Sequence, residues 1–421
     1  MKNKLRKLTA VSLVNATARA LIGPITLLFI SYQLSDEILG IYYIFFSILA
    51  MKQLLEVGIG SVLKQYYAHA NLDAVNNQTK IAQYYSFSKI WFSIISISFL
   101  CLCVIVGELN FISYSGDVEW RKPWYLVILF SCLNIMTLPT LIYLDGNQQQ
   151  IKSNVLNLLS ILASSLSLWL SLYNGFGLYS VAVSQFFLSL PVWLYTLKRF
   201  SPKISNSFSY QDFVLILKEL SAMLSKTSII WFSGFFYWNG FNFISFHLLG
   251  AAMTGKIGLS LAMAKAGMSI ASSITTAQQT VYANLIANNN SLRAISLFKK
   301  NAVISIVMLI IGYITFLFLN YYFNDFELFK KVLTNNEMIY LFLFFLSTLC
   351  IMLINNYIRC YKVEIFLKIS LINSILVPLS FFISIKHEWP FFLLAFIIIS
   401  ISVLISFSKA KKFIHNQNRA N

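Results

Sequence analysis

Apolar residues occur in long runs along the whole chain, and short polar segments separate one run from the next. A run of about 20 apolar residues can cross the hydrocarbon core of a membrane as a helix. Twelve runs reach about this length, at roughly 9–32, 40–64, 86–107, 124–143, 154–173, 178–197, 225–248, 256–280, 301–322, 338–358, 365–385 and 390–408. The pattern therefore predicts an all-α polytopic membrane protein with about twelve transmembrane helices.

The two halves of the chain share an internal repeat. Residues 70–80 and 283–293 have six identical positions at an offset of 213, and residues 29–34 resemble 243–248 at an offset of 214. Six predicted spans lie in each half, so both halves run through the membrane in the same direction. We therefore predict two six-helix bundles that are parallel repeats about an axis along the membrane normal, an arrangement in which transporters bind substrate at the repeat interface.

The predicted lobes occupy residues 1–200 and 225–421. The stretch 201–224 between them begins with a polar, Ser-rich segment containing Pro202, which is typical of a linker. Within it, the apolar spacing over 213–220 predicts a short helix lying at the cytoplasmic membrane interface.

Composition supports the membrane assignment and gives the orientation. The chain is 58% hydrophobic and only 11% charged, whereas soluble proteins carry about 25% charged residues. With the N-terminus in the cytoplasm, 23 of the 32 Lys and Arg residues lie in inner segments and six in outer loops, which predicts that both termini are cytoplasmic. The net charge of +17 then reflects topology and attraction to anionic membrane lipids rather than nucleic-acid binding.

Three cations fall in the middle of predicted spans: Arg19, Lys52 and Lys265. Each costs about 2.5–3.5 kcal/mol at the centre of a bilayer, and only Glu56 is a comparably deep acid. The three therefore predict a wet, cationic cavity that binds an anion such as a phosphate group. Lys52 aligns with Lys265 at the repeat offset, so we expect the two to face each other across a central cleft.

Each of these residues also has a structural alternative. Lys52 can pair with Glu56 one turn further on, and Lys265 can extend its charge toward the membrane surface. Asn15 and Arg19 share a helix face with Gly23 and are predicted to bind substrate. The alternative for Arg19 is an interhelical hydrogen bond that fixes the bundle.

Four further residues are weaker candidates. Glu56 and Asp145 are acids in or beside spans, with roles as ion-pair partners or in proton coupling. Lys226 and Arg359 lie near helix ends, where ordinary positive-inside placement competes with a role in the site. The His and Cys residues show no metal-ligand spacing, and Gly250–Ile257 resembles a phosphate-binding loop without its final Ser or Thr. We therefore expect no metal, no cofactor and no enzymatic activity.

Two short motifs, together with the layout, carry a family resemblance. Leu39-Gly40-Ile41-Tyr42 opens the second span, and Glu56-Val57-Gly58 followed by Lys64 closes it. With the six-plus-six arrangement and the intramembrane cations, the chain resembles the Wzx-type polysaccharide flippases. Their superfamily also contains the multidrug and toxin extruders and the lipid II flippases.

The resemblance implies a substrate and a location. The substrate is an oligosaccharide repeat unit, such as that of O-antigen, linked to undecaprenyl diphosphate and flipped from the inner to the outer leaflet of the bacterial cytoplasmic (inner) membrane. Implied partners are membrane lipids, a polysaccharide polymerase and a chain-length regulator. Arg19, Lys52 and Lys265 would then neutralise the diphosphate.

Two other functions stay open. A multidrug or metabolite exporter of the same fold would favour carboxylates in its cavity if it carried cationic drugs, and this chain has few. A polysaccharide polymerase or ligase typically has one large outer loop, whereas the longest predicted outer loops here are about 15 residues.

Overall fold

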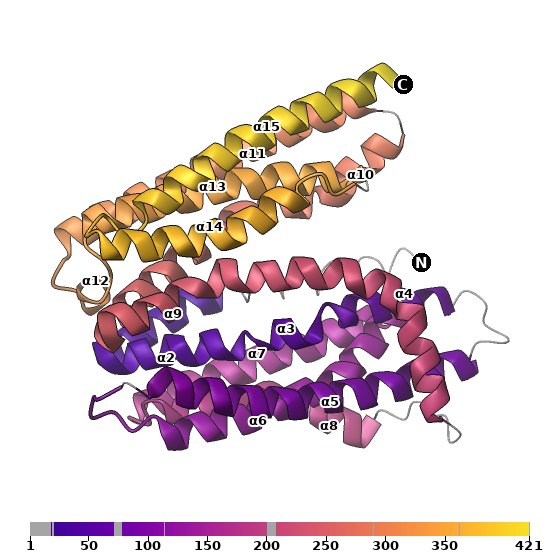
Figure 1. Cartoon of the computed structure of the whole chain (residues 1–421), viewed down its shortest axis with the longest axis horizontal. Helices are drawn as coiled ribbons and strands as arrows, with labels where there is room; N and C mark the ends of the chain where they lie inside the picture. Colours follow the sequence, from indigo (N-terminus) through magenta and orange to yellow (C-terminus); the bar gives the residue numbers. More distant parts are fainter. Residues whose placement is uncertain are drawn as a thin grey trace. The chain divides into compact units, whose positions relative to one another are not determined.

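The computed structural model describes residues 18, 21–70, 78–112, 114–199, 208–288, 290–361 and 363–420, and these are helical with short connections (Figure 1). Ten helices in this part of the chain are long and apolar enough to cross a membrane. One of them, Trp231–Ile286, contains two of the predicted spans, and the shorter helix Leu21–Gln33 is the described part of the first. Each of the twelve predicted runs thus corresponds, wholly or in part, to a described helix, and the protein is an all-α polytopic membrane protein.

The chain divides into two compact units, Met1–Phe235 (unit 1) and Phe236–Asn421 (unit 2). In unit 1, α6 packs against α4, α5 and α8, and α7 packs against α8. The helices of unit 1 are Leu21–Gln33, α2 (Asp36–Leu49), α3 (Lys52–Glu56), α4 (Ile59–Ala70), α5 (Gln78–Phe111), α6 (Arg121–Gly146), α7 (Gln150–Tyr173) and α8 (Tyr179–Arg199), followed by the first part of α9 (Tyr210–Ala277).

Unit 2 contains the rest of α9 and the helices that follow it. Figure 1 shows α11, α13, α14 and α15 running alongside one another, and α15 packs against both α13 and α14. After α9 come α10 (Gln279–Ala287), α11 (Ser291–Tyr322), α12 (Glu327–Lys330), α13 (Asn335–Arg359), α14 (Leu367–Lys386) and α15 (Leu393–Ala420).

The helix starts repeat at the offset that the sequence predicts. α6 and α13 begin 214 residues apart, as do α8 and α15. The order of long helices in unit 2 therefore follows that in unit 1.

The second predicted span, expected as one helix over 40–64, is broken into α2, α3 and α4. Ser35 accepts a hydrogen bond from the Ile38 amide and caps the start of α2, with Asp36 and Glu37 in the first turn. The chain leaves helical geometry at Val57 and Gly58, which have φ values of 45° and 77°. A Val at positive φ is uncommon, so the surrounding packing of α4 must hold this break in place.

The helix predicted over 213–220 is not separate from the next span. It is the beginning of α9, which continues from Tyr210 to a kink at Gly250. Gly250 has φ 81° and ψ 176°, a conformation that is open essentially to glycine alone. The predicted turn between the seventh and eighth spans is therefore made at this residue.

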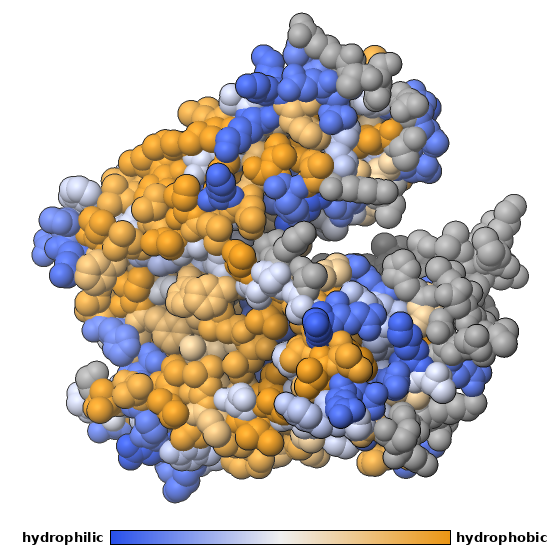
Figure 2. Space-filling model, turned by 45° about the vertical axis from the view of Figure 1, so that its right-hand side comes forward, coloured by the Kyte–Doolittle hydropathy of each residue, from blue (hydrophilic) through white to orange (hydrophobic). Residues whose placement is uncertain are grey.

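Aromatic side chains form much of each core. In unit 1, Trp124 lies 4.6 Å from Phe45 between ring centroids and donates to the Cys103 carbonyl at 3.3 Å. In unit 2, Tyr313 stacks on Phe342 at 3.9 Å and donates to the Ala264 carbonyl. Outside these cores, large apolar side chains of α5 and α11 are exposed, and hydrophobic residues cover broad areas of the face in Figure 2. Such surface is stable when it contacts lipid.

Candidate functional site

The break in the second span places Lys52 and Glu56 on the five-residue helix α3. Because they are four residues apart, their side chains lie on one face, and Lys52 Nζ is 3.4 Å from Glu56 Oε1. The same Nζ lies 3.5 Å from Oδ1 of Asn134 on α6. The side chains of Lys52 and Glu56 are 27% and 20% exposed, so the pair is only partly shielded from its surroundings. The ion pair that the sequence left as an alternative is therefore present, and substrate binding by Lys52 stays a prediction.

Asn134 connects this ion pair to a cavity inside unit 1 that is lined by both apolar and polar side chains. The cavity has a volume of about 460 Å³ and lies between the helix Leu21–Gln33, α6, α7 and α8. Its polar lining side chains are Asn134, Thr137, Asn157 and Ser160, and no carboxylate is among its lining residues in the described part of unit 1. Uncharged amide and hydroxyl groups of this kind can bond to water or to the hydroxyls of a sugar.

The helix Leu21–Gln33 contributes Gly23 to the cavity wall and is held in unit 1 by Trp169 of α7. Trp169 donates from Nε1 to Thr26 Oγ1 at 3.0 Å, and its ring stacks on Phe29 at 5.4 Å. Asn15 and Arg19, predicted to bind substrate from the same helix, lie outside the described residues. Their role stays a prediction.

Lys265 lies in unit 2, on the part of α9 that follows the kink. Its Nζ is 4.7 Å from the ring centroid of Trp238, which lies before the kink on the same element. No carboxylate in the described part of the chain lies within 4 Å of Lys265. A cation over the face of Trp is attracted by the ring quadrupole, by about 0.5–1 kcal/mol at exposed sites, and its charge stays available to an anion.

The remaining candidates fall at helix ends. Asp145, at the end of α6, pairs with Lys64 of α4 at 2.6 Å. Arg359, at the end of α13, pairs with Glu364 at 2.7 Å, and both side chains are exposed. Lys226 lies within α9, and its side chain is outside the described part. Proton coupling through Glu56 or Asp145 stays a prediction, as does the expectation that Lys52 and Lys265 share one cleft.

Sequence comparisons give no match, whereas structural comparison finds proteins of similar fold. No protein-family model matches the chain, and no curated protein matches it. An inward-facing multidrug resistance MATE family transporter of the MOP superfamily aligns with a TM-score of 0.72 and 13% identity over 99% of both chains. Its outward-facing counterpart aligns with a TM-score of 0.60 and 15% identity, over 100% of this chain and 96% of that one.

A third structure is a MOP superfamily transporter from Pyrococcus furiosus, described as having a binding pocket of reverse polarity that suggests a different function. It aligns with a TM-score of 0.55 and 14% identity, over 98% of this chain and 96% of that one. The chain has the fold of these transporters. This is the fold that the sequence resemblance implies, and membership of the superfamily and of its flippase family stays a prediction.

Two partners of the candidate residues were not identified from the sequence. Asn134 lies 82 positions from Lys52, and no spacing on one helix connects them. Trp238 could have been found, because it lies 12 residues before Gly250 and Lys265 lies 15 after it. A sharp reversal at Gly250 brings such positions together. Among the described residues, no group of three His, Cys, Asp or Glu side chains is placed to hold a metal.

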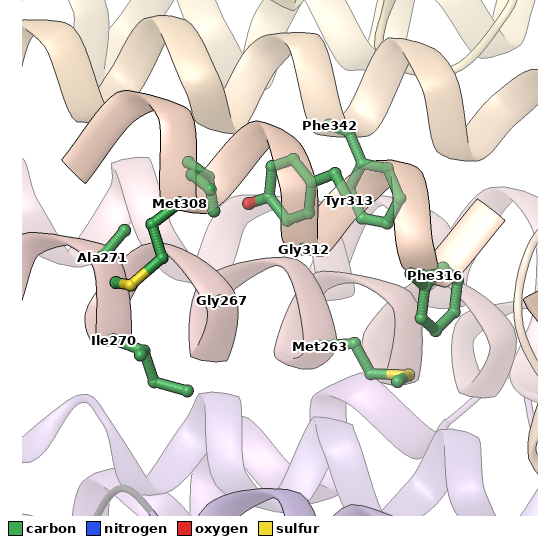
Figure 3. A pocket seen from close by; sticks show the side chains of 10 residues that line it. Met263, Gly267, Ile270, Ala271, Met308, Gly312, Tyr313, Phe316 and Phe342 are labelled. Carbon is green, nitrogen blue, oxygen red and sulfur yellow. The ribbon is translucent and has the colours of Figure 1, made fainter. Parts of the chain in front are cut away.

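A second cavity, in unit 2, is apolar. It has a volume of about 250 Å³ between α9, α11 and α13. Figure 3 shows Met263, Met308 and Phe316 around it, and Gly267 and Gly312 also line it. The hydroxyl of Tyr313 is already bonded to the Ala264 carbonyl at 2.8 Å. The described residues that line this cavity therefore include no cation and no available hydroxyl that could bind an anion.

Proposed function

We propose that the protein is a flippase that moves an oligosaccharide repeat unit, linked to undecaprenyl diphosphate, from the inner to the outer leaflet of the cytoplasmic membrane by alternating access. The observation that carries the proposal is Lys265. It is a lysine in a membrane span with no carboxylate within 4 Å among the described residues, held over the Trp238 ring. A lysine without a counterion inside a membrane span costs free energy, and such residues are typically functional. Binding an anion would explain its presence here.

The chemistry of the proposed substrate matches three features. A diphosphate needs cations, which Lys265 supplies directly, and Lys52 and Arg19 add to it in this proposal. A glycan needs hydroxyl and amide partners, which the unit 1 cavity offers through Asn134 and Asn157. Sugar rings also bind against aromatic faces, and Trp238 provides one beside the cation. The lipid tail stays in the bilayer and needs no enclosed path.

A multidrug exporter is the second candidate, because the MATE structures that this fold resembles are multidrug resistance transporters. A cationic drug needs a free carboxylate. Glu56 and Asp145 are each within 4 Å of a lysine, so neither is free in this structure. The MOP transporter with a pocket of reverse polarity supports the view that this fold accommodates pockets of different charge.

The test is to delete the protein from its host and locate the lipid-linked glycan by mass spectrometry and leaflet-specific labelling. Single repeat units should accumulate on the inner leaflet, and surface polysaccharide should disappear. Restoration by the wild-type chain is the control.

Two other outcomes each reject the proposal. Single units that reach the outer leaflet but are never polymerised would indicate a polymerase. An unchanged pool of lipid-linked glycans, together with increased drug sensitivity, would indicate the exporter.

A further inference from the structure

A third cavity, larger than the two described above, has no part in the proposed function. It lies at the end of unit 2 where α11 begins and α13 and α15 end, and its volume is about 680 Å³. Its wall is continuous with a buried cluster that includes Tyr357, Ile358 and Ala410. It is therefore built by the packing of three helices and is not a gap at a loop.

The floor of this cavity is apolar. Phe298 of α11 stacks on Tyr357 of α13, with ring centroids 4.4 Å apart and planes 20° apart, and Ile354 and Ile414 line the space beside them. Phe407 of α15, at the mouth, is 62% exposed. Exposed aromatic and aliphatic surface of this kind is stable against a hydrocarbon chain and costly against water.

The rim is basic. Lys299 of α11 and Lys411 and Lys412 of α15 line the cavity and are exposed. None of the three has a carboxylate within 4 Å in the described part of the chain. Glu364, an acid that follows α13, is already bonded to Arg359. The rim therefore keeps a local positive charge.

From this combination we propose that the cavity binds an anionic phospholipid, with its phosphate between Lys299, Lys411 and Lys412 and one acyl chain against Phe298 and Ile354. The site lies where the apolar part of α15 gives way to its charged end, which is the depth of a lipid headgroup. Basic pockets between transmembrane helices bind acidic headgroups in this way. The inference is independent of the proposed transport function.

Free phosphate would use the lysines but leave the apolar floor exposed to water. A lipid uses both parts, which is why the geometry favours it. Ordinary attraction between lysines and an acidic membrane surface is the competing explanation, and the chain offers matched controls for it. Lys300 and Lys409 are exposed on the same helices but do not line the cavity, and Lys368 is exposed at the start of α14.

The experiment uses purified full-length protein, stripped of lipid, with binding followed by native mass spectrometry. The probes are dioleoyl phosphatidylglycerol, dioleoyl phosphatidylcholine, short-chain dihexanoyl phosphatidylglycerol and inorganic phosphate. We expect dioleoyl phosphatidylglycerol to bind at least about tenfold more tightly than each of the other three, since only it supplies both charge and chain.

Two variants of equal charge separate the cavity from the surface. Lys299→Gln/Lys411→Gln/Lys412→Gln should weaken phosphatidylglycerol binding about tenfold, and Lys300→Gln/Lys368→Gln/Lys409→Gln should change it less than twofold. Equal weakening by both triple variants would overturn the proposal in favour of a general surface effect. Binding of inorganic phosphate or the short-chain lipid as tight as that of the dioleoyl lipid would overturn the role of the apolar floor.

A third variant tests the apolar part without changing charge. Ser408→Trp places a large ring in the mouth of the cavity at an exposed position, so the fold should tolerate it. It should weaken phosphatidylglycerol binding at least about fivefold, whereas Ser370→Trp, on the exposed surface of α14, should not. Unchanged binding by Ser408→Trp would place the lipid elsewhere and overturn the proposal.

Discussion

Lys265 and Lys52 align in the internal repeat, yet their immediate partners differ. Lys52 has a carboxylate and an amide oxygen within 3.5 Å, whereas Lys265 has an aromatic ring. A carboxylate competes with an anionic ligand for the ammonium group, and a ring does so only weakly. The two lysines should therefore contribute unequally to transport, with Lys265 the more important.

Substitution of Lys265 tests this directly. A charged hydrogen bond contributes about 1.5–3 kcal/mol, so Lys265→Gln should lower the transport rate by about 10- to 100-fold. Lys368→Gln, on the exposed surface of α14, should leave it unchanged. The rate is measured in proteoliposomes with the lipid-linked glycan, at equal protein levels. Equal rates for the two variants would show that Lys265 does not contact the substrate.

The ion pair on α3 predicts a measurable coupling energy. Because Lys52 and Glu56 are partly shielded, with side chains 27% and 20% exposed, removing one partner leaves the other only partly compensated. A double-mutant cycle of Lys52→Met and Glu56→Gln should give a coupling of about 1 kcal/mol in the free energy of unfolding. The exposed pair Lys330–Glu327, cycled in the same way, should give less than about 0.5 kcal/mol. A larger coupling for the exposed pair would contradict this account.

Sequence reasoning reached some of these residues and missed their surroundings for a physical reason. A cation in the middle of an apolar run identifies Lys52 and Lys265, because a charge at the centre of a membrane is costly. The i, i+4 spacing also predicted the ion pair between Lys52 and Glu56 as an alternative. Asn134 could not be identified as a partner of Lys52, because it lies 82 positions away and only tertiary packing brings the two together. The contact of Trp238 with Lys265 depends on the turn at Gly250, which the sequence did indicate.

At the scale of elements, hydropathy predicted where the chain crosses the membrane and missed where the helices break. Hydropathy depends on side chains, whereas a break depends on backbone angles. The second span is apolar across Val57, and nothing in Val57 itself signals a positive φ. Gly250 was placed in a predicted turn, and there the glycine was the visible cue. The interfacial helix was predicted as separate because its polar face resembles a surface helix, yet α9 continues through it.

The kink in α9 predicts an unusual sensitivity at Gly250. No atom lies within 4 Å of a Cβ added there, so Gly250→Ala causes no clash. Its φ of 81° with ψ of 176° should nevertheless cost about 1–3 kcal/mol of unfolding free energy. Gly234→Ala in the helical part of α9 also meets no atom and should be neutral or stabilising by up to about 1 kcal/mol. Denaturant titration in bicelles measures both, and equal stabilities would refute the role assigned to Gly250.

At the scale of the whole molecule, the repeat offset predicted from the sequence recurs in the described helices. The offset found in two short motifs recurs in the starts of α6 and α13, and of α8 and α15. The placement of Lys52 and Lys265 toward one cleft is a property of both units together and stays a prediction.

The parallel repeat predicts that matching helix ends lie on the same side of the membrane. In a chain without its five cysteines, Gln78→Cys and Ser291→Cys, at the starts of α5 and α11, should react with an impermeant maleimide only after the cells are permeabilised. Asp117→Cys and Asp325→Cys, in the loops that follow these helices, should react in intact cells. Labelling of Gln78→Cys and Ser291→Cys from opposite sides would exclude a parallel repeat.

The division of the second span into three helices also affects how Lys52 and Glu56 can move. α2 and α4 are anchored by fully buried residues such as Phe45 and Tyr67, whereas no residue of α3 is buried. A short helix without a buried residue, lying between two interruptions of the helical backbone, can turn while α2 and α4 stay in place. Lys52 and Glu56 are the first and last residues of this short helix, α3. Exchanging their mutual contact for a ligand therefore needs only local torsion at Ala50–Met51 and Val57–Gly58, and no shift of the bundle.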